Sequence, residues 1–352
     1  MRLLQSMLLV ALLQAIGLAQ TNCALYTTIQ NCLAAVPAAG GEALVPAGTY
    51  FSVTSTAYVG SATGGPVVLH IMDGAQLTIN ITSGADAIEL FNGSMLKCDR
   101  GNATDATAHI YMGNNAKVNN VIMNAQYQSF AAVEGCFIFD PLTSNAIVGN
   151  VIYFSGLGAP SYIRDTIIYD FPAPQITITN TVGHAGGVGF LENVWSDCNS
   201  QTNCYPLRIL AADGVSGHGS PGNIQIIGGA YTWPGAGIPI ILINGQPPNT
   251  PSAITIVGVY LEGSHTNIGL QIHDAHDIQI IGLSGAGDAN TDLVELEGVT
   301  SATYNIRAMG VTNEIANANN WKNTIYDAIE GIPYTQFSIS DYTYRGTSIV
   351  YP

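Results

Sequence analysis

The chain has 352 residues, of which 39 are Gly and 16 are Pro; 47% are hydrophobic and only 9% are charged. So small a charged fraction excludes a coiled coil, a solvated helical protein and a disordered tail. Nine Lys and Arg against 24 Asp and Glu give a net charge of −15, and so few cations exclude nucleic acid as a partner because they cannot neutralise its phosphates.

The first 19 residues have the pattern of a secretory signal peptide. Arg2 gives a positively charged N-terminal region, and an apolar run over residues 8–18 follows. The segment ends in Gly17-Leu18-Ala19, where small residues suit a cleavage site. The run is short for a membrane-spanning helix. We therefore expect cleavage after residues 1–19 and a secreted protein without membrane contact; an uncleaved membrane anchor is the alternative.

Six cysteines follow this segment, and an even number in an exported protein predicts disulfides. Short separations favour the pairs Cys23–Cys32 and Cys198–Cys204, while sequence alone does not fix the full pairing. A metal site is the weaker alternative because no CxxC or clustered Cys/His spacing occurs.

The next predicted element is a short helix in residues 27–36. Ile29, Leu33 and Val36 recur there at helical spacing and share one face. We expect this amphipathic helix to belong to an N-terminal cap over residues 20–40, covering the open end of the domain that follows.

An imperfect internal repeat runs through much of residues 41–352. Each copy places a short residue before strand-like alternation of polar and apolar residues, with copies beginning at Asn120, Asn150, Asn193, Asn223, Ala253, Asp277 and Asn305. A second strand-like run precedes several copies, and no helical pattern interrupts them. Fixed strands with variable spacers at this period are typical of a solenoid. We therefore predict an all-β fold, a single-stranded right-handed parallel β-helix with one rung per repeat.

The polar residues that open the repeats predict a ladder. Asn tolerates a left-handed turn conformation, and stacked Asn side chains bond their neighbours above and below. We expect a structural role at one common corner for Asn120, Asn150, Asn193, Asn223 and Asn305. The same alignment predicts one continuous interior stripe of Ile224, Ile254, Ile278 and Ile306.

Residues 40–50, Gly-Gly-Glu-Ala-Leu-Val-Pro-Ala-Gly-Thr-Tyr, resemble the opening of parallel β-helix proteins of the pectin-lyase-like superfamily. With the repeats, the resemblance covers residues 25–350. It implies a secreted carbohydrate-active enzyme that cleaves a polysaccharide, with a glycoside hydrolase favoured over a polysaccharide lyase. Since the superfamily also includes adhesins, a non-catalytic carbohydrate-binding or adhesin-type surface protein is the alternative. We expect a monomer.

Two catalytic signatures of that superfamily are incomplete. Gly217-His218-Gly219 is similar to an element of polygalacturonases, but the accompanying Asn-Thr-Asp, Asp-Asp and Arg-Ile-Lys segments are absent. The segment 193–198 looks like a pectate lyase motif in which Cys198 replaces the His. A lyase would also need a base, for which Arg208 is available, and Ca²⁺ on the uronate; no cofactor is otherwise expected.

In hydrolytic members of the superfamily, the carboxylates lie in the turn that follows the ladder strand. The corresponding turns here hold Glu262 and Asp288, on consecutive rungs, and we predict them as the catalytic pair; solvated turn carboxylates are the alternative. Substrate-binding candidates near these turns are His265, Arg208 and the outward aromatic residues Tyr231 and Trp233, which could stack on sugar rings. For the cluster His273, Asp274, His276 and Asp277 we expect no metal, because the side chains alternate between opposite faces.

Overall fold

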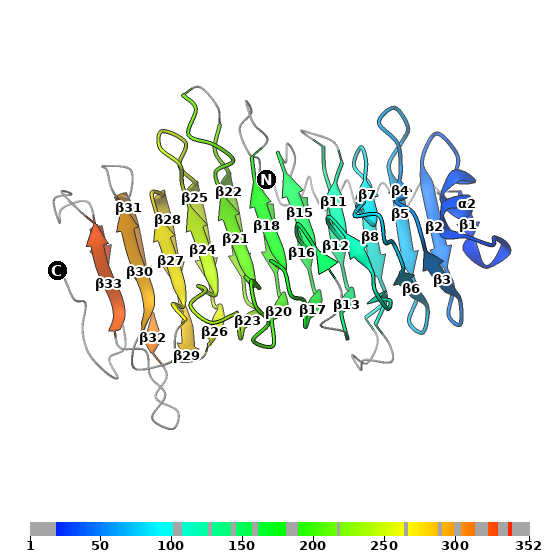
Figure 1. Ribbon diagram of the computed structural model, residues 1–352. Coiled ribbons are helices and arrows are strands. Elements are labelled where there is room, and N and C mark those ends of the chain that lie inside the picture. Colours follow the sequence, from blue (N-terminus) through cyan, green and yellow to red (C-terminus); the bar gives the residue numbers. More distant parts are fainter. Residues whose placement is uncertain are drawn as a thin grey trace.

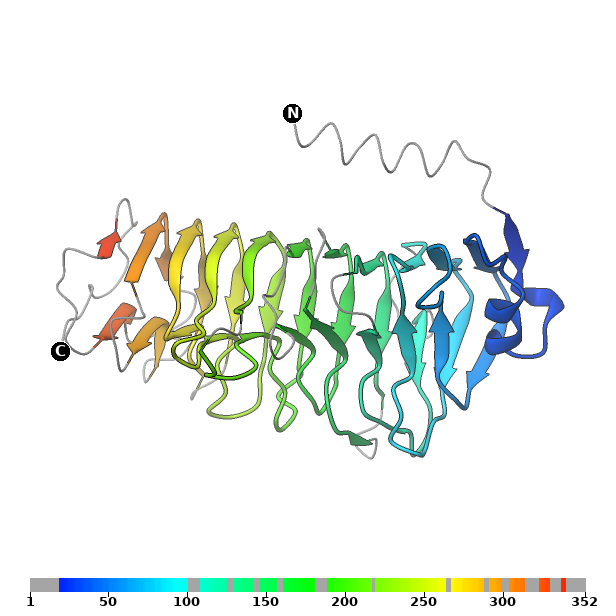
Figure 2. The same ribbon diagram turned by 90° about the horizontal axis from the view of Figure 1, so that it is seen from above.

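The computed structural model describes residues 19–100, 108–125, 129–141, 146–156, 161–180, 189–216, 219–263, 267–287, 291–298, 304–313, 323–329 and 337–339. These residues form three long sheets that follow the same axis (Figures 1 and 2). The expected signal segment, apart from its last residue, lies outside the described residues. No helix within the described ranges is long and apolar enough to cross a membrane.

Sheet A has twelve strands: β1 (Gln20–Asn22), β2 (Gly41–Val45), β5 (Val67–Ile71), β8 (Met95–Cys98), β12 (Ala132–Glu134), β16 (Ser161–Arg164), β19 (Gly189–Glu192), β22 (Gly222–Ile227), β25 (Ser252–Val257), β28 (His276–Ile281), β31 (Tyr304–Met309) and β34 (Phe337–Ile339). Sheet B has ten: β3 (Tyr50–Val53), β6 (Gln76–Ile79), β9 (Ile110–Met112), β13 (Phe137–Phe139), β17 (Ile167–Tyr169), β20 (Trp195–Asp197), β23 (Ala230–Thr232), β26 (Tyr260–Glu262), β29 (Ser284–Ala286) and β32 (Thr312–Asn313).

Sheet C also has ten strands: β4 (Ala57–Val59), β7 (Ile88–Leu90), β11 (Ile122–Asn124), β15 (Ile152–Ser155), β18 (Ile176–Thr179), β21 (Leu207–Leu210), β24 (Ile241–Asn244), β27 (Leu270–His273), β30 (Asp292–Gly298) and β33 (Asn323–Ile329). Two short strands, β10 (Lys117–Val118) and β14 (Ala146–Ile147), pair outside these sheets. Within most rungs the chain passes from sheet A to B to C, and every strand pairs in parallel with the next rung. The predicted parallel β-helix is therefore confirmed.

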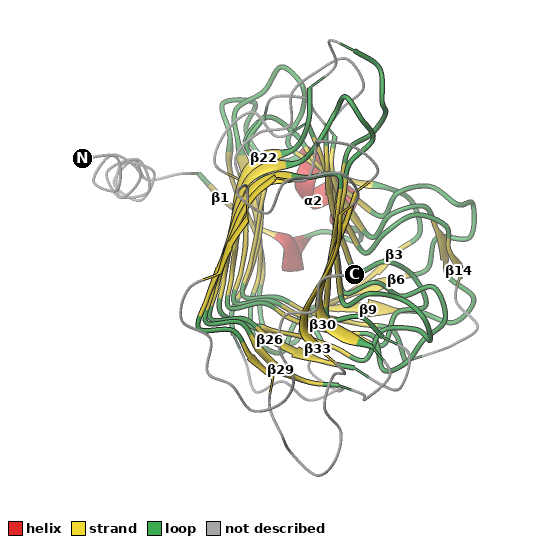
Figure 3. Cartoon of the chain, turned by 90° about the vertical axis from the view of Figure 1, so that its left-hand side faces the viewer, coloured by secondary structure: helices red, strands yellow, loops and turns green. Residues whose placement is uncertain are grey.

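The interior is filled by aligned side chains from successive rungs. Ile224, Ile254, Ile278 and Ile306 stand in register on β22, β25, β28 and β31, and none is more than 2% exposed. The predicted interior stripe is thus confirmed. Because side chains alternate with period two, each strand that buries this stripe presents its intervening residues on the outer face. Figure 3, viewed along the stack, shows sheets A and C on opposite sides of the core.

The prediction of a single asparagine ladder is wrong, because the candidates occupy three different positions in the rung. Asn120 and Asn150 precede sheet C, where the backbone N and Nδ2 of Asn150 donate to Asn120 Oδ1 at 2.9 and 3.1 Å. Asn193 lies at the corner between sheets A and B and donates to Asp165 Oδ1 at 2.6 Å. Asn223 and Asn305 lie within strands of sheet A. An alternating pattern does not reveal which of three sheets a strand joins.

The A–B corner is instead lined mainly by glycine in the later rungs. Gly228, Gly258, Gly282 and Gly310 have φ between 61° and 64°, a region that residues with a Cβ rarely adopt. Asp165 and Asn193 continue this column with φ of 49° and 53°. The corner is therefore a stack of residues in the left-handed conformation, one above another in successive rungs.

The N-terminal end is closed by η1 (Cys23–Leu25) and α2 (Ile29–Ala34). Thr28 caps α2 by accepting from Asn31 N at 3.1 Å, and Ile29 and Leu33 are buried, as the sequence predicts. The disulfides Cys23–Cys32 and Cys198–Cys204 are both present, and a third joins Cys98 to Cys136.

Candidate functional site

The outer face of sheet C carries a column of outward side chains that runs along the stack. Each member is in register with the next, so neighbours are one rung apart, about 4.8 Å. From β4 to β30 the column is Tyr58, Glu89, Met123, Tyr153, Thr177, Arg208, Leu242, Gln271 and Glu295. Two of its members carry chemistry: Glu295, which pairs with Glu297 of the same strand, and Arg208.

The glutamate pair lies on β30, where Val294 and Leu296 are buried and Glu295 and Glu297 face outward. A hydrogen bond joins the two carboxyl groups. From the neighbouring rung, Gln271 Nε2 lies 3.4 Å from Glu295 Oε1 and 3.3 Å from Glu297 Oε2, so one amide donates to both carboxyl groups. The strand alternation that buries the two apolar residues thus also brings the two acids together.

Burial, followed by the hydrogen bond and the charge of Glu297, raises the pKa of Glu295 to about 8, while the hydrogen bond from Gln271 opposes this shift. Two carboxyl groups in contact cannot both ionise easily, so one proton is held between them at neutral pH. A carboxylic acid that stays protonated at pH 7, beside a second carboxyl group, is the arrangement used for general acid and base catalysis.

Two histidine–aspartate pairs flank this region. His273, in register with Glu297, has its Nδ1 3.2 Å from Asp274 Oδ2, and His276 Nδ1 lies 2.8 Å from Asp277 Oδ2. His273 belongs to sheet C and His276 to sheet A, so the two pairs are separate. Among the described residues, no group of three His, Cys, Asp or Glu side chains is arranged to hold a metal ion.

Arg208 is a half-buried cation without an acidic partner. Its Nε donates to Thr177 Oγ1 at 3.1 Å, its NH2 group donates to Asn150 Oδ1 at 2.8 Å, and its Cζ lies 5.1 Å from the ring centre of Tyr205. Burial lowers its pKa, although Tyr205 and Tyr153 oppose the shift; arginine still keeps its proton. No carboxylate of the described chain forms an ion pair with it.

The guanidinium is therefore held by neutral groups only, in a protein of net charge −15. Three rungs separate Arg208 from Glu295, about 14 Å along the face. Sheet C thus presents a cation that lacks a counter-ion and a proton-sharing carboxyl pair on one straight surface.

Of the remaining predicted site residues, the described ones do not lie on this face. Glu262 is on β26 of sheet B, where burial, and then the charge of Asp197, raise its pKa. Asp288 and His265 lie outside the described residues, as does His218 of the polygalacturonase-like segment. The structure therefore separates Glu262 from Arg208 by placing them on different sheets.

Of the two aromatic candidates, Trp233 is 37% exposed and Tyr231 is not exposed at all. The prediction that Tyr231 faces outward is wrong. It is the central residue of β23 and is in register with the buried Ser196 and Leu261, so its ring packs into the core. Its neighbours on the strand are Ala230 and the buried Thr232, and neither offers a ring to a sugar.

Sequence reasoning found Arg208 but missed the pair on β30. The run Val294-Glu295-Leu296-Glu297 is recognisable as a strand from its alternation. Two acids at alternate positions of one strand necessarily share a face, and this spacing was the available signal.

Comparisons with known proteins give no family assignment. No family model matches the chain, and no curated protein matches its sequence. Among solved structures, the A-module of the mannuronan C-5 epimerase AlgE4 from Azotobacter vinelandii is similar, with 15% sequence identity and a TM-score of 0.44 over 93% of this chain and 100% of that chain.

Proposed function

We propose that this protein is a secreted glycoside hydrolase that cleaves an acidic polysaccharide on the outer face of sheet C. The observation that carries the proposal is the hydrogen-bonded pair of Glu295 and Glu297, in which the pKa of Glu295 rises to about 8. A surface acid that is protonated at neutral pH can donate a proton to a leaving oxygen, and few exposed carboxyl groups can.

In the proposed reaction Glu295 is the general acid and Glu297 the general base. Glu295 donates its proton to the glycosidic oxygen as the bond from that oxygen to the anomeric carbon breaks. Glu297 accepts a proton from a water molecule, whose oxygen forms the new bond to the anomeric carbon. Both product sugars therefore leave with complete hydroxyl groups, and the proton removed by one carboxyl replaces the proton given by the other.

The proposed reaction requires the two carboxyl groups to move apart. They are in contact in the structure, whereas the carboxyl groups of inverting enzymes stand roughly 6.5–9.5 Å apart to leave room for the water. The Cα atoms of residues two apart on a strand are separated by about 6.6 Å, so rotation of the side chains can open a gap when a sugar binds. Because water attacks the anomeric carbon directly in this scheme, we expect inversion at that carbon.

Arg208 supports an acidic substrate. A carboxylate on a sugar would supply the counter-ion that the guanidinium lacks. Because the protein is strongly acidic, a polyanion would be repelled from most of its surface. Arg208 offsets that repulsion at one point, three rungs from the reacting pair.

Export rests on two features. The three disulfides are typical of proteins that fold in an oxidising compartment, and residues 1–19 have the signal-peptide pattern. Detection of the mature protein in the medium, with a new N-terminus near Gln20, would test this part of the proposal.

The experiment on function is a screen of purified protein against pectins, other polyuronates and neutral polysaccharides. New reducing ends without absorbance from unsaturated uronates support hydrolysis, whereas that absorbance would replace hydrolysis by elimination. Glu295→Gln and Glu297→Gln should each abolish the detected activity, and Glu262→Gln should not. Activity that survives both changes on β30 but is lost in Glu262→Gln would move the site to sheet B. Sugar binding without turnover would establish the adhesin-type alternative.

A further inference from the structure

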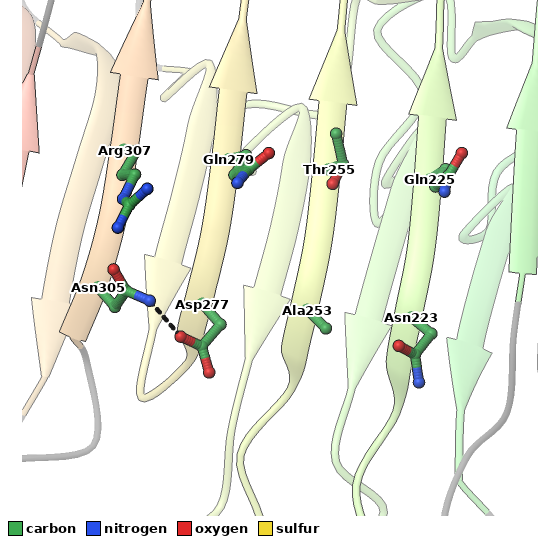
Figure 4. A pocket seen from close by; sticks show the side chains of 8 residues that line it. All are labelled: Asn223, Gln225, Ala253, Thr255, Asp277, Gln279, Asn305 and Arg307. Carbon is green, nitrogen blue, oxygen red and sulfur yellow. Dashed lines mark hydrogen bonds between the residues drawn. The ribbon is translucent and has the colours of Figure 1, made fainter.

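A second feature unrelated to sheet C is a hollow on the outer face of sheet A. Its volume is about 670 Å³, and its lining comes from four successive strands, β22, β25, β28 and β31. Figure 4 shows the eight lining side chains in two rows along the stack: Asn223, Ala253, Asp277 and Asn305 in one, and Gln225, Thr255, Gln279 and Arg307 in the other. A hollow of this size is within the range of small-ligand sites.

The first row has an unusual backbone. All four of its residues have positive φ, between 53° and 56°, and each lies between two residues that pair with an adjacent rung. Asn and Asp tolerate this left-handed conformation, whereas Ala does not. Ala253 is therefore the one member of the row that is strained, and it is also the smallest. Its short side chain leaves the space between Asn223 and Asp277 open.

Backbone strain is a sign of function when it persists at a position where a residue better suited to the conformation would fill a hollow. An asparagine at position 253 would suit the backbone, as it does at 223 and 305, but its amide would occupy the space. The small side chain is explained if that space is used.

The lining is rich in groups that both donate and accept hydrogen bonds. The side chains of Asn223, Gln225 and Gln279 bond no group in the described part of the protein. An amide offers one acceptor and one donor group, which matches a sugar hydroxyl. Since the rungs repeat at about 4.8 Å, Gln225, Thr255 and Gln279 present such groups at even intervals.

The charges of the hollow are balanced. Asp277 accepts hydrogen bonds from Asn305 and from His276 Nδ1, and these bonds, together with the charge of Arg307, lower its pKa. Asp277 and Arg307 are the two charged members of the lining, and their charges cancel. A site with no net charge in a protein of −15 favours a neutral ligand over an anion.

Beside the polar rows, a third row of outward side chains is apolar. Ile227, Ile281 and Met309 are 39%, 37% and 43% exposed, and Val257 lies between the first two. Pyranose rings have apolar C–H faces and polar hydroxyl edges. An amphipathic surface, with amides along one side and aliphatic groups along the other, is complementary to both.

From this arrangement we propose that the outer face of sheet A is a non-catalytic binding site for a neutral oligosaccharide. The chain lies along the stack, with its hydroxyl groups on the amides of Gln225 and Gln279 and its C–H faces towards Ile227 and Ile281. The site is on the other side of the core from sheet C (Figure 3) and does not depend on the chemistry proposed there.

The test is a calorimetric titration of the full-length mature protein with xylohexaose, cellohexaose and mannohexaose, and with hexagalacturonate as the anionic probe. We expect at least one neutral hexasaccharide to bind, with affinity reduced about tenfold or more in Gln279→Ala, since one lost sugar contact of about 1.4 kcal/mol gives that factor. Gln20→Ala is the matched control, because Gln20 is an exposed amide on the same sheet at β1.

Ala253→Asn separates binding from folding. It should raise the midpoint of thermal unfolding, since Asn suits the left-handed backbone. It should also weaken binding of the same oligosaccharide, since its side chain enters the hollow. Arg208→Ala on sheet C should leave that binding unchanged. The proposal is overturned if no neutral hexasaccharide binds at millimolar concentration, if Gln279→Ala and Ala253→Asn bind as well as the parent, or if Arg208→Ala removes the binding.

Discussion

Glu295 and Glu297 are separated by one residue and both face outward on β30, and a hydrogen bond joins their carboxyl groups. The contact exists because the intervening Leu296 is buried in the core, which forces both acids to the same side. Gln271, in register with Glu295 on the rung before, donates to both. The fold itself thus creates the proton-sharing pair, since each of these positions is fixed by the parallel register.

The first prediction concerns the pH dependence of activity. Because the pKa of Glu295 is about 8, its acid form persists through neutral pH and is lost above it. The rate, measured as kcat/KM, should therefore fall on the alkaline side with a midpoint near pH 8. In Glu295→Asp a residual activity with a shifted alkaline midpoint is expected. An alkaline limb at the same pH in Glu295→Gln would show that another group is responsible.

The same shift predicts how stability changes with pH. In the unfolded chain Glu295 titrates near pH 4.5, and in the folded protein near pH 8, so the folded state binds more protons between these values. Stability therefore falls as pH rises through this window, and the contribution is complete below it. Glu295→Gln, which cannot ionise, should flatten this part of the profile of urea midpoint against pH. A profile as steep as that of the parent would contradict the shift.

The solenoid was predictable from sequence because its cause is local and repeated. A polar residue followed by alternating Ile residues recurs in the later rungs, and this spacing led directly to the stripe of Ile224, Ile254 and Ile278. The ladder prediction failed for Asn120 and Asn193 because the same local pattern occurs at three different positions of the rung. Which position a residue occupies depends on loops whose lengths vary.

The site was less predictable, for a physical reason. The raised pKa of Glu295 comes first from burial and then from the hydrogen bond and the charge of Glu297. The acidic run shows the two glutamates, but it does not show how far the fold buries Glu295. Tyr231 was misplaced because the turn at Gly228 and Gly229, both with positive φ, resets the inward and outward alternation between β22 and β23.

A third prediction tests the interior stripe. Ile254→Ala removes a fully buried side chain and should lower the free energy of unfolding by roughly 2–5 kcal/mol through lost burial and a new cavity. Ile281→Ala is the matched control, since Ile281 faces outward and is 37% exposed; its effect should stay within about 0.5 kcal/mol. Urea denaturation measures both changes in the free energy of unfolding, provided that its slope against urea concentration is the same for each variant. Equal effects would mean that the stripe does not form the core.

A fourth prediction compares two disulfides. Cys98–Cys136 closes a separation of 38 residues and Cys198–Cys204 one of 6. Because the longer loop restricts the unfolded chain more, replacing Cys98 and Cys136 by Ser should destabilise the protein by about 4 kcal/mol, against about 2 kcal/mol for the shorter bridge. Thermal unfolding of the two double variants gives the order. If removal of the shorter bridge caused the larger loss of stability, that bridge would act mainly through the folded state and not through the unfolded chain.

The last prediction concerns Arg208, whose guanidinium is bound by Asn150 and Thr177 and stacked on Tyr205 without a carboxylate. If a sugar carboxylate is its partner, Arg208→Ala should raise KM for a polyuronate by roughly 10–150-fold, since a charged hydrogen bond contributes about 1.5–3 kcal/mol. The value of kcat should change little, because the guanidinium lies three rungs from the reacting pair.

Two controls separate charge recognition from a structural role of Arg208. Arg208→Lys should give an intermediate KM, since lysine keeps the charge but lacks the planar fork that binds Asn150 and Thr177 together. A methyl-esterified form of the same polymer, which has no carboxylate to offer, should show almost the same KM with the parent and with Arg208→Ala. For the free acid, the KM of the parent should also rise with salt, as screening weakens the attraction. A loss that is equal for the acid and the ester would mean that Arg208 supports the local fold around Tyr205 and does not bind the substrate charge.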